Sequence, residues 1–136
     1  MSEMNKAEFN SVTAEMLKVI SDYDSATGFQ GAYNIRQDSQ CAGRRSSENI
    51  TITSKTDKPG IDIRIKPGTK GETVYIPACV THSDVDDLVY NDFYVGEGAD
   101  VVIVAGCGVH SDGSETARHN GIHRFFLEKG ARVLYK

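Results

Sequence analysis

The sequence predicts a mainly β fold that follows an N-terminal amphipathic helix. Three observations support this. Apolar and polar residues alternate in runs from residue 50 onward, glycine and proline separate these runs, and helical spacing of apolar residues is found near the N-terminus. We therefore divide the chain into residues 1–48, an amphipathic helix and a loop, and residues 49–136, a β core.

The helix is predicted over residues 5–23. Phe9, Val12 and Met16 lie on one face at helical spacings, and a helix this short draws most of its stability from packing of that face. From 24 to 48 the chain is rich in Ser, Gly, Gln, Asn and Arg, which predicts a long, partly ordered loop.

Strands are predicted where apolar residues recur at every second position. Residues 50–53 alternate isoleucine with threonine, and residues 61–65 alternate isoleucine with charged residues. Pro59-Gly60 and Pro67-Gly68 predict turns, because proline fixes φ and glycine accepts positive φ. Further strands are predicted at 74–76, 88–90, 93–95, 101–104, 125–127 and 133–135.

A unit of strand, polar glycine turn and second strand recurs three times in the β core. The turn glycines are Gly68, Gly98 and Gly130, so the steps are 30 and 32 residues, within the range of solenoid repeats. Because each solenoid unit buries its apolar face on its neighbours, residues 133–135 would need a further unit beside them. Ordinary hairpins in a sandwich or barrel would give the same periodicity, so both architectures stay open at this point.

Composition and charge argue against several classes of protein. A net charge of −4 without a basic stripe argues against a nucleic-acid surface. The odd count of Cys41, Cys79 and Cys107, without a C-x-x-C spacing, suits free thiols in the cytoplasm. The N-terminus lacks the regions of a signal peptide, and the longest apolar stretch, residues 101–105, is too short to cross a bilayer. We expect no nucleic-acid or membrane partner.

Three of the four histidines follow Cys107 closely in the sequence. Cys107 and His110 are three residues apart and His119 and His123 four, and thiolate and imidazole bind zinc, iron or an iron–sulphur cluster. We therefore predict a metal site formed by Cys107, His110, His119 and His123. Two alternatives remain. One is an inert free cysteine, and the other is a metal- or thiol-dependent enzyme that uses Cys107 with nearby histidines, with Cys107 as the nucleophile and a histidine as the base in the thiol-dependent case.

A second pair, Cys79 and His82, repeats the spacing of Cys107 and His110 one unit earlier. Equivalent positions of stacked units lie beside one another. The two pairs would therefore meet if the register aligned Cys79 with Cys107.

Five short sequence motifs follow one another along the chain in a characteristic order: GAYNIR at 31–36, DKPGIDI at 57–63, LVYNDFYVG at 88–96, AGCGVH at 105–110 and HNGIH at 119–123. Together they resemble the SufB/SufD family of iron–sulphur cluster assembly proteins, and most closely its compact archaeal- or clostridial-type members. The resemblance covers nearly the whole chain.

The resemblance implies a right-handed parallel β-helix, of which this chain would hold the opening turns. It implies a scaffold rather than an enzyme, with a transient iron–sulphur cluster as cargo and with the ABC-type ATPase SufC and a second SufB/SufD-type chain as partners. In the family, the SufC-docking helices and the cysteine and histidine most often implicated in cluster chemistry lie further toward the C-terminus. We therefore expect an N-terminal part of a longer scaffold. We also expect the chain to form a homodimer through the last unit. A further alternative to the assembly scaffold is a purely structural β-solenoid interaction module.

Overall fold

The computed structural model describes residues 31–38, 40–80, 86–109 and 118–136. In these ranges the chain is mainly β and forms two mixed sheets. The helix predicted over residues 5–23 lies outside the described residues. Among those residues, no helix has the length and apolar character that would let it cross a membrane.

The larger sheet has the strand order β11-β8-β5-β1-β6-β9, with β2 paired to β1, and the smaller sheet has the order β10-β7-β4-β3. The strands predicted from period-two alternation are confirmed, and those predicted at 88–90 and 93–95 are one continuous strand. In chain order the strands are β1 (Ala32–Gln37), β2 (Gln40–Arg45), β3 (Ile50–Ser54), β4 (Gly60–Ile65), β5 (Lys70–Tyr75), β6 (Ala78–Val80), β7 (Asp86–Val95), β8 (Asp100–Val104), β9 (Cys107–Val109), β10 (Arg118–Leu127) and β11 (Arg132–Tyr135).

The loop predicted over residues 24–48 is wrong for the residues of β1 and β2. β1 lies inside the larger sheet, parallel to β5 on one side and to β6 on the other, and β2 pairs with it antiparallel. Residues 32–35 are all buried. In a strand that is buried on both faces, apolar and polar residues do not alternate. Its sequence therefore lacks the period-two pattern from which a strand is predicted.

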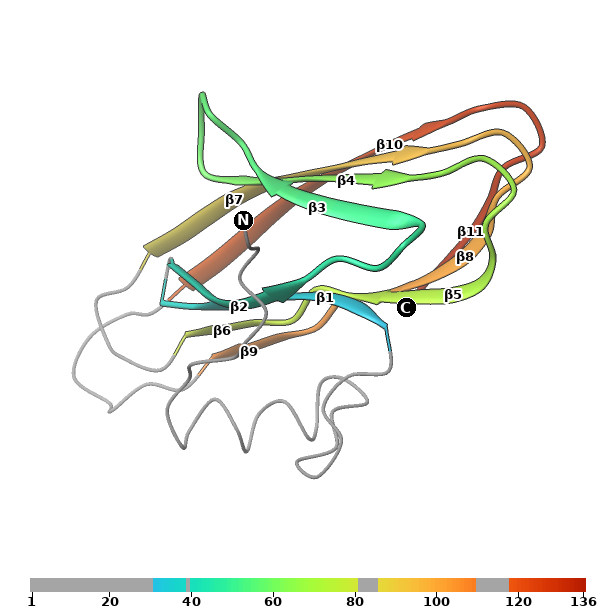
Figure 1. Cartoon of the computed structure of the whole chain (residues 1–136). Helices are drawn as coiled ribbons and strands as arrows, with labels where there is room; N and C mark the ends of the chain where they lie inside the picture. Colours follow the sequence, from blue (N-terminus) through green and yellow to red (C-terminus); the bar gives the residue numbers. More distant parts are fainter. Residues whose placement is uncertain (1–30, 39, 81–85, 110–117) are drawn as a thin grey trace.

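Three units of strand, turn and strand lie side by side, and their turns nest along one side of the molecule (Figure 1). β4, β7 and β10 are parallel neighbours in the smaller sheet, and β5, β8 and β11 are parallel neighbours in the larger. Ile65 pairs with Val95, and Val95 pairs with Leu127. The paired residues are therefore 30 and 32 residues apart in the sequence, the same steps that separate the turn glycines. The register of the smaller sheet thus confirms the predicted repeat length.

The glycine turns of the three units share one backbone conformation. Gly68, Gly98 and Gly130 have φ of 76°, 71° and 72°, a left-handed region that costs little for glycine alone. The Gly68 N–H donates to the Glu97 carbonyl at 2.9 Å, and the Gly98 N–H donates to the Lys129 carbonyl at 3.0 Å. The first and second turns are therefore each hydrogen-bonded to the turn of the next unit.

The main hydrophobic core lies between the two sheets and thins out at the third unit. Phe93 in the second unit is fully buried, whereas its register partner Phe125 in the third is 37% exposed. β10 and β11 are the terminal strands of their sheets in the described part of the chain. Other large apolar side chains that they expose are Ile122, Phe126, Leu127, Leu134 and Tyr135.

An ion-pair column crosses the outer face of the smaller sheet. Asp62, Asp92 and Arg124 are register partners on β4, β7 and β10. Arg124 donates to both carboxylate oxygens of the buried Asp92, at 2.9 and 2.8 Å, and Lys55 Nζ contacts Asp92 at 2.7 Å and Asp62 at 2.6 Å. The hydrogen bond from Arg124, followed by that from Lys55, overcomes burial and holds the pKa of Asp92 well below its usual range.

Candidate functional site

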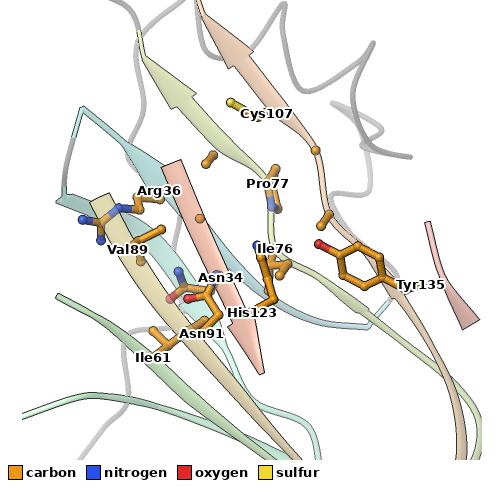
Figure 2. Close-up of a pocket in the computed structure, with 14 residues that line it drawn as sticks. Asn34, Arg36, Ile61, Ile76, Pro77, Val89, Asn91, Cys107, His123 and Tyr135 are labelled. Atoms are coloured by element: carbon orange, nitrogen blue, oxygen red, sulfur yellow. The ribbon is translucent and has the colours of Figure 1, made fainter. Parts of the chain in front are cut away.

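A cavity of about 300 Å³ lies between the two sheets (Figure 2). Two columns of register partners contribute to its wall, one from each sheet. The column of the larger sheet is Arg36, Ala78 and Cys107, and that of the smaller sheet is Ile61, Asn91 and His123. The stacking of the units therefore places chemically different side chains at equivalent positions.

Asn91 lies at an inward position of β7 that alternation would give to an apolar residue. Its neighbours on the same face, Val89 and Phe93, are both buried. Asn91 is 7% exposed, and its Oδ1 has no hydrogen-bond partner among the described residues. A buried acceptor without a partner costs about 1–3 kcal/mol, so the cavity favours an occupant that donates a hydrogen bond to Oδ1.

His123 lies on β10 at the position equivalent to Asn91. Its ring is stacked with that of Phe93 at a centroid distance of 6.1 Å and meets the edge of Tyr135 at 5.7 Å. These contacts orient the imidazole at the cavity wall. Burial raises the pKa of the Tyr135 phenol, so its hydroxyl stays protonated, and Figure 2 shows this hydroxyl turned toward Ile76.

The larger sheet contributes the cationic side of the cavity. Arg36 lies across the view from Tyr135 in Figure 2. Asn34, on the same strand, accepts a hydrogen bond from Arg44 Nε at 2.8 Å and one from Cys41 Sγ at 3.5 Å, which holds its amide in place. Among the described residues that line the cavity, none is Asp or Glu.

Two of the four predicted metal ligands, Cys107 and His123, line the same cavity. Cys107 is exposed and comes from the larger sheet, and Figure 2 shows it at a distance from His123. His119 lies four residues before His123 in the extended strand β10, so their backbones are about 13 Å apart. His110 lies outside the described residues. In the described ranges, no group of three or more His, Cys, Asp or Glu side chains could hold a metal ion.

Cys79 does not align with Cys107. The register pairs Ala78 with Cys107 and Cys79 with Gly108. Because successive residues of a strand point to opposite faces, this offset turns the two thiols apart. Cys79 is fully buried in a second cluster, where its neighbours include Tyr33 and Ile35. A joint site of the two cysteine–histidine pairs would need Cys79 beside Cys107, and the register does not place them so. His82 lies outside the described residues.

Sequence reasoning missed Arg36, Asn91 and Tyr135 as cavity residues. A signal for Asn91 was present, because a polar residue interrupts the inward-facing series of Val89, Phe93 and Val95. Arg36 carried no such signal, since it lies in a strand that was predicted to be a loop. Tyr135 was predicted within a strand, but its position beside His123 depends on how the sheets face each other.

The fold and the site define a mainly β protein whose two mixed sheets line a partly polar cavity that is open to solvent. No protein-family model, curated protein or solved structure matches the chain.

Proposed function

We propose that the chain is an N-terminal part of a cytoplasmic iron–sulphur cluster assembly scaffold of SufB/SufD type. The observation that supports this is the parallel register of three units at steps of 30 and 32 residues. A parallel β-helix has the same arrangement of stacked strands and nested turns, so in this proposal the units are the opening turns of a right-handed parallel β-helix. The role is that of a scaffold and not of an enzyme.

The cargo in this proposal is an iron–sulphur cluster, bound transiently. Cys107 and His123 supply a thiolate and an imidazole, both of which bind iron, and they line one cavity. The exposure of Cys107 suits a cluster that is received and passed on. His110 and His119 are proposed as further ligands, with His110 the nearer to Cys107 in sequence.

The proposed partners are the ABC-type ATPase SufC and a second SufB/SufD-type chain. The third unit supports a partner chain, because β10 and β11 expose apolar side chains at the terminal strands of both sheets. Terminal strands with apolar side chains readily pair with other strands. Self-association into a homodimer through the same unit is part of the proposal.

Anaerobic incubation of the chain with ferrous iron and sulphide tests the proposal directly. After desalting, we expect iron and sulphide to co-elute with the protein, with the visible absorption of a cluster, and a stoichiometric acceptor apoprotein to remove both. Retention that no acceptor reverses would contradict a scaffold role. Elution of the protein free of iron and sulphide would contradict cluster binding.

A thiol-dependent enzyme is a second candidate, which the shared cavity of Cys107 and His123 favours. In that case His123 would act as the base, which requires its imidazole and the Cys107 thiol, apart in Figure 2, to come within hydrogen-bond reach of each other. The rate of iodoacetamide alkylation at Cys107 distinguishes the two functions. An enzyme requires this rate to fall in His123→Gln, whereas the scaffold function predicts no dependence on His123.

A further inference from the structure

We propose that the open edge of the third unit binds an acidic strand–turn–strand segment, which adds to the molecule as a parallel fourth unit. The open edge is the outer side of β10, of β11 and of the turn between them, over residues 124–134. Among the described residues, β10 and β11 are the terminal strands of their sheets. This inference rests on the partner role in the proposed function and deepens it, because it gives the sequence chemistry of the segment that fits.

The second and third units carry opposite charges at equivalent positions. Their sequences are DFYVGEGAD at 92–100 and RFFLEKGAR at 124–132. The pairs of equivalent residues, with the acid first, are Asp92 with Arg124, Glu97 with Lys129, and Asp100 with Arg132. Each acid of the second unit is therefore matched with a base of the third.

The bases of the third unit are accessible from the open edge. Lys129 and Arg132 are exposed, and the side chain of Arg124 is 55% exposed although it also donates to the second unit. Glu128 is the one acid of this stretch, and its counterpart in the second unit, Gly96, is uncharged. Opposite charges at directly opposed positions stabilise a strand pair, and like charges destabilise it. A segment that repeats the acids of the second unit therefore suits this edge, whereas one that repeats the bases of the third does not.

Aromatic stacking provides a second match between the edge and such a segment. Phe93 stacks on Phe125 with centroids 4.8 Å apart, and Tyr94 stacks on Phe126 with centroids 5.0 Å apart. Phe125 and Phe126 are nevertheless 37% and 44% exposed. Aromatic side chains at the same two positions of a fourth unit would continue both stacks, and cross-strand aromatic pairs stabilise neighbouring strands.

The turns provide a third match through main-chain hydrogen bonds. Between the second and third units these bonds run from the Glu128 N–H to the Val95 carbonyl, from the Gly98 N–H to the Lys129 carbonyl, and from the Arg132 N–H to the Ala99 carbonyl. The same pattern at the open edge would use the Leu127 carbonyl, the Gly130 N–H and the Ala131 carbonyl. Gly130 has a φ of 72°, as the earlier turn glycines do, so its turn already has the conformation that nests. The incoming segment therefore needs a glycine turn in the same register.

Two peptides taken from the chain test the proposal, because residues 88–104 copy the second unit and residues 120–136 copy the third. Each is labelled and titrated with the full chain in iron-free buffer, and fluorescence anisotropy reports binding. The 88–104 peptide should bind at least about tenfold more tightly than the 120–136 peptide and than a scrambled peptide of its own composition. Light scattering should show one chain with one peptide, since the peptide and the proposed homodimer use the same edge.

The absence of binding by the 88–104 peptide, equal binding of the three peptides, or a peptide bound to a persisting dimer would each overturn the proposal. Because iron and sulphide are absent throughout, these outcomes are independent of cluster uptake. A failure of this inference is therefore distinguishable from a failure of the scaffold function.

Charge reversal tests the register of the added segment. Lys129→Glu with Arg132→Glu in the chain should weaken binding of the 88–104 peptide about tenfold, and Glu97→Lys with Asp100→Arg in the peptide should restore it. Both substituted residues of the chain are exposed, so far-UV circular dichroism should stay unchanged.

The matched control is Lys58→Glu with Arg64→Glu, which makes the same change in net charge at exposed cations in and beside β4. It should change the affinity for the 88–104 peptide less than about twofold. Equal weakening by the control variant, or no restoration by the reversed peptide, would show attraction without register and would overturn the proposal.

Discussion

Phe125 stacks on Phe93, with ring centroids 4.8 Å apart and ring planes 8° from parallel. The two residues are register partners of β10 and β7, so the third unit repeats the side-chain position of the second. One residue further along the same strands, on the outer face, the rings of Tyr94 and Phe126 stack in the same way, with centroids 5.0 Å apart. Such cross-strand aromatic pairs stabilise the sheet and link consecutive units.

Phe93→Ala should destabilise the chain more than the equivalent substitution one unit later. Phe93 is fully buried, so its truncation leaves a cavity and costs about 3–5 kcal/mol of unfolding free energy. Phe125 is partly exposed, so Phe125→Ala should cost about 1–2 kcal/mol. Urea denaturation monitored by circular dichroism measures both. Equal costs would contradict the description of the third unit as the exposed end of the core.

Gly98 and Gly96 should respond to alanine for different reasons. At Gly98, φ is positive and a Cβ would have nothing within 4 Å, so Gly98→Ala should cost about 1–2 kcal/mol through backbone strain alone. At Gly96, a Cβ would lie 2.5 Å from the Pro67 nitrogen and 2.8 Å from the Ile65 carbonyl oxygen. Gly96→Ala should therefore cost more, because it separates neighbouring turns.

Gly98→Asn is the matched control for this comparison, since asparagine accepts positive φ more readily than alanine. Urea denaturation should rank Gly98→Asn as the mildest of the three substitutions, Gly98→Ala as intermediate and Gly96→Ala as the most severe. A Gly96→Ala variant as stable as the unsubstituted chain would show that the turns do not pack closely.

Acid should weaken the ion-pair column through Asp92. The pKa of this carboxyl is lowered in the folded chain, mainly by the hydrogen bond from Arg124. The ionised Asp92 therefore contributes its full stabilisation above the unfolded pKa of about 3.9. That contribution is lost as pH falls through the folded value. Asp92→Asn should cost about 3 kcal/mol at neutral pH, because Lys55 loses one of its two carboxylate partners.

The difference between Asp92→Asn and the unsubstituted chain should therefore shrink steadily from about pH 5 to about pH 2. Urea denaturation across this range measures it. Asp57→Asn, which removes an exposed carboxylate, is the control and should show no comparable pH dependence. A constant difference for Asp92→Asn would contradict a role for the ionised carboxylate.

The exposed apolar residues of the third unit should drive self-association. Light scattering should give a dimer for the chain, and Phe126→Lys with Leu134→Lys should give a monomer, because charges at both terminal strands oppose pairing. Leu88→Lys replaces an exposed leucine of β7 and should leave the dimer intact. A monomeric unsubstituted chain would contradict this proposal.

Much of the β core could be predicted from the sequence, because half-buried strands alternate and left-handed turns require glycine. Ile61, Ile63 and Ile65 show this alternation, and Gly68, Gly98 and Gly130 mark the register. β1 could not be predicted in the same way, because burial of residues 32–35 removes the alternation.

The candidate site was predicted in part. Cys107 and His123 were chosen for their chemistry, and the fold places both at one cavity. Arg36 and Asn91 join them because β1 pairs with β6 and the two sheets face each other, which are contacts distant in sequence. The spacing of His119 and His123 would bring two ligands together on a helix, but it separates them along a strand.

The most direct measurement is cluster uptake by three cysteine variants, reconstituted anaerobically with iron and sulphide in parallel with the unsubstituted chain. We predict that Cys107→Ser loses the visible absorption and the bound iron, whereas Cys41→Ser retains both, because Cys41 does not line the cavity. Cys79→Ser should also retain them if it folds, since this thiol is turned away from Cys107. Full uptake by Cys107→Ser would contradict the assignment of this cavity to cluster assembly.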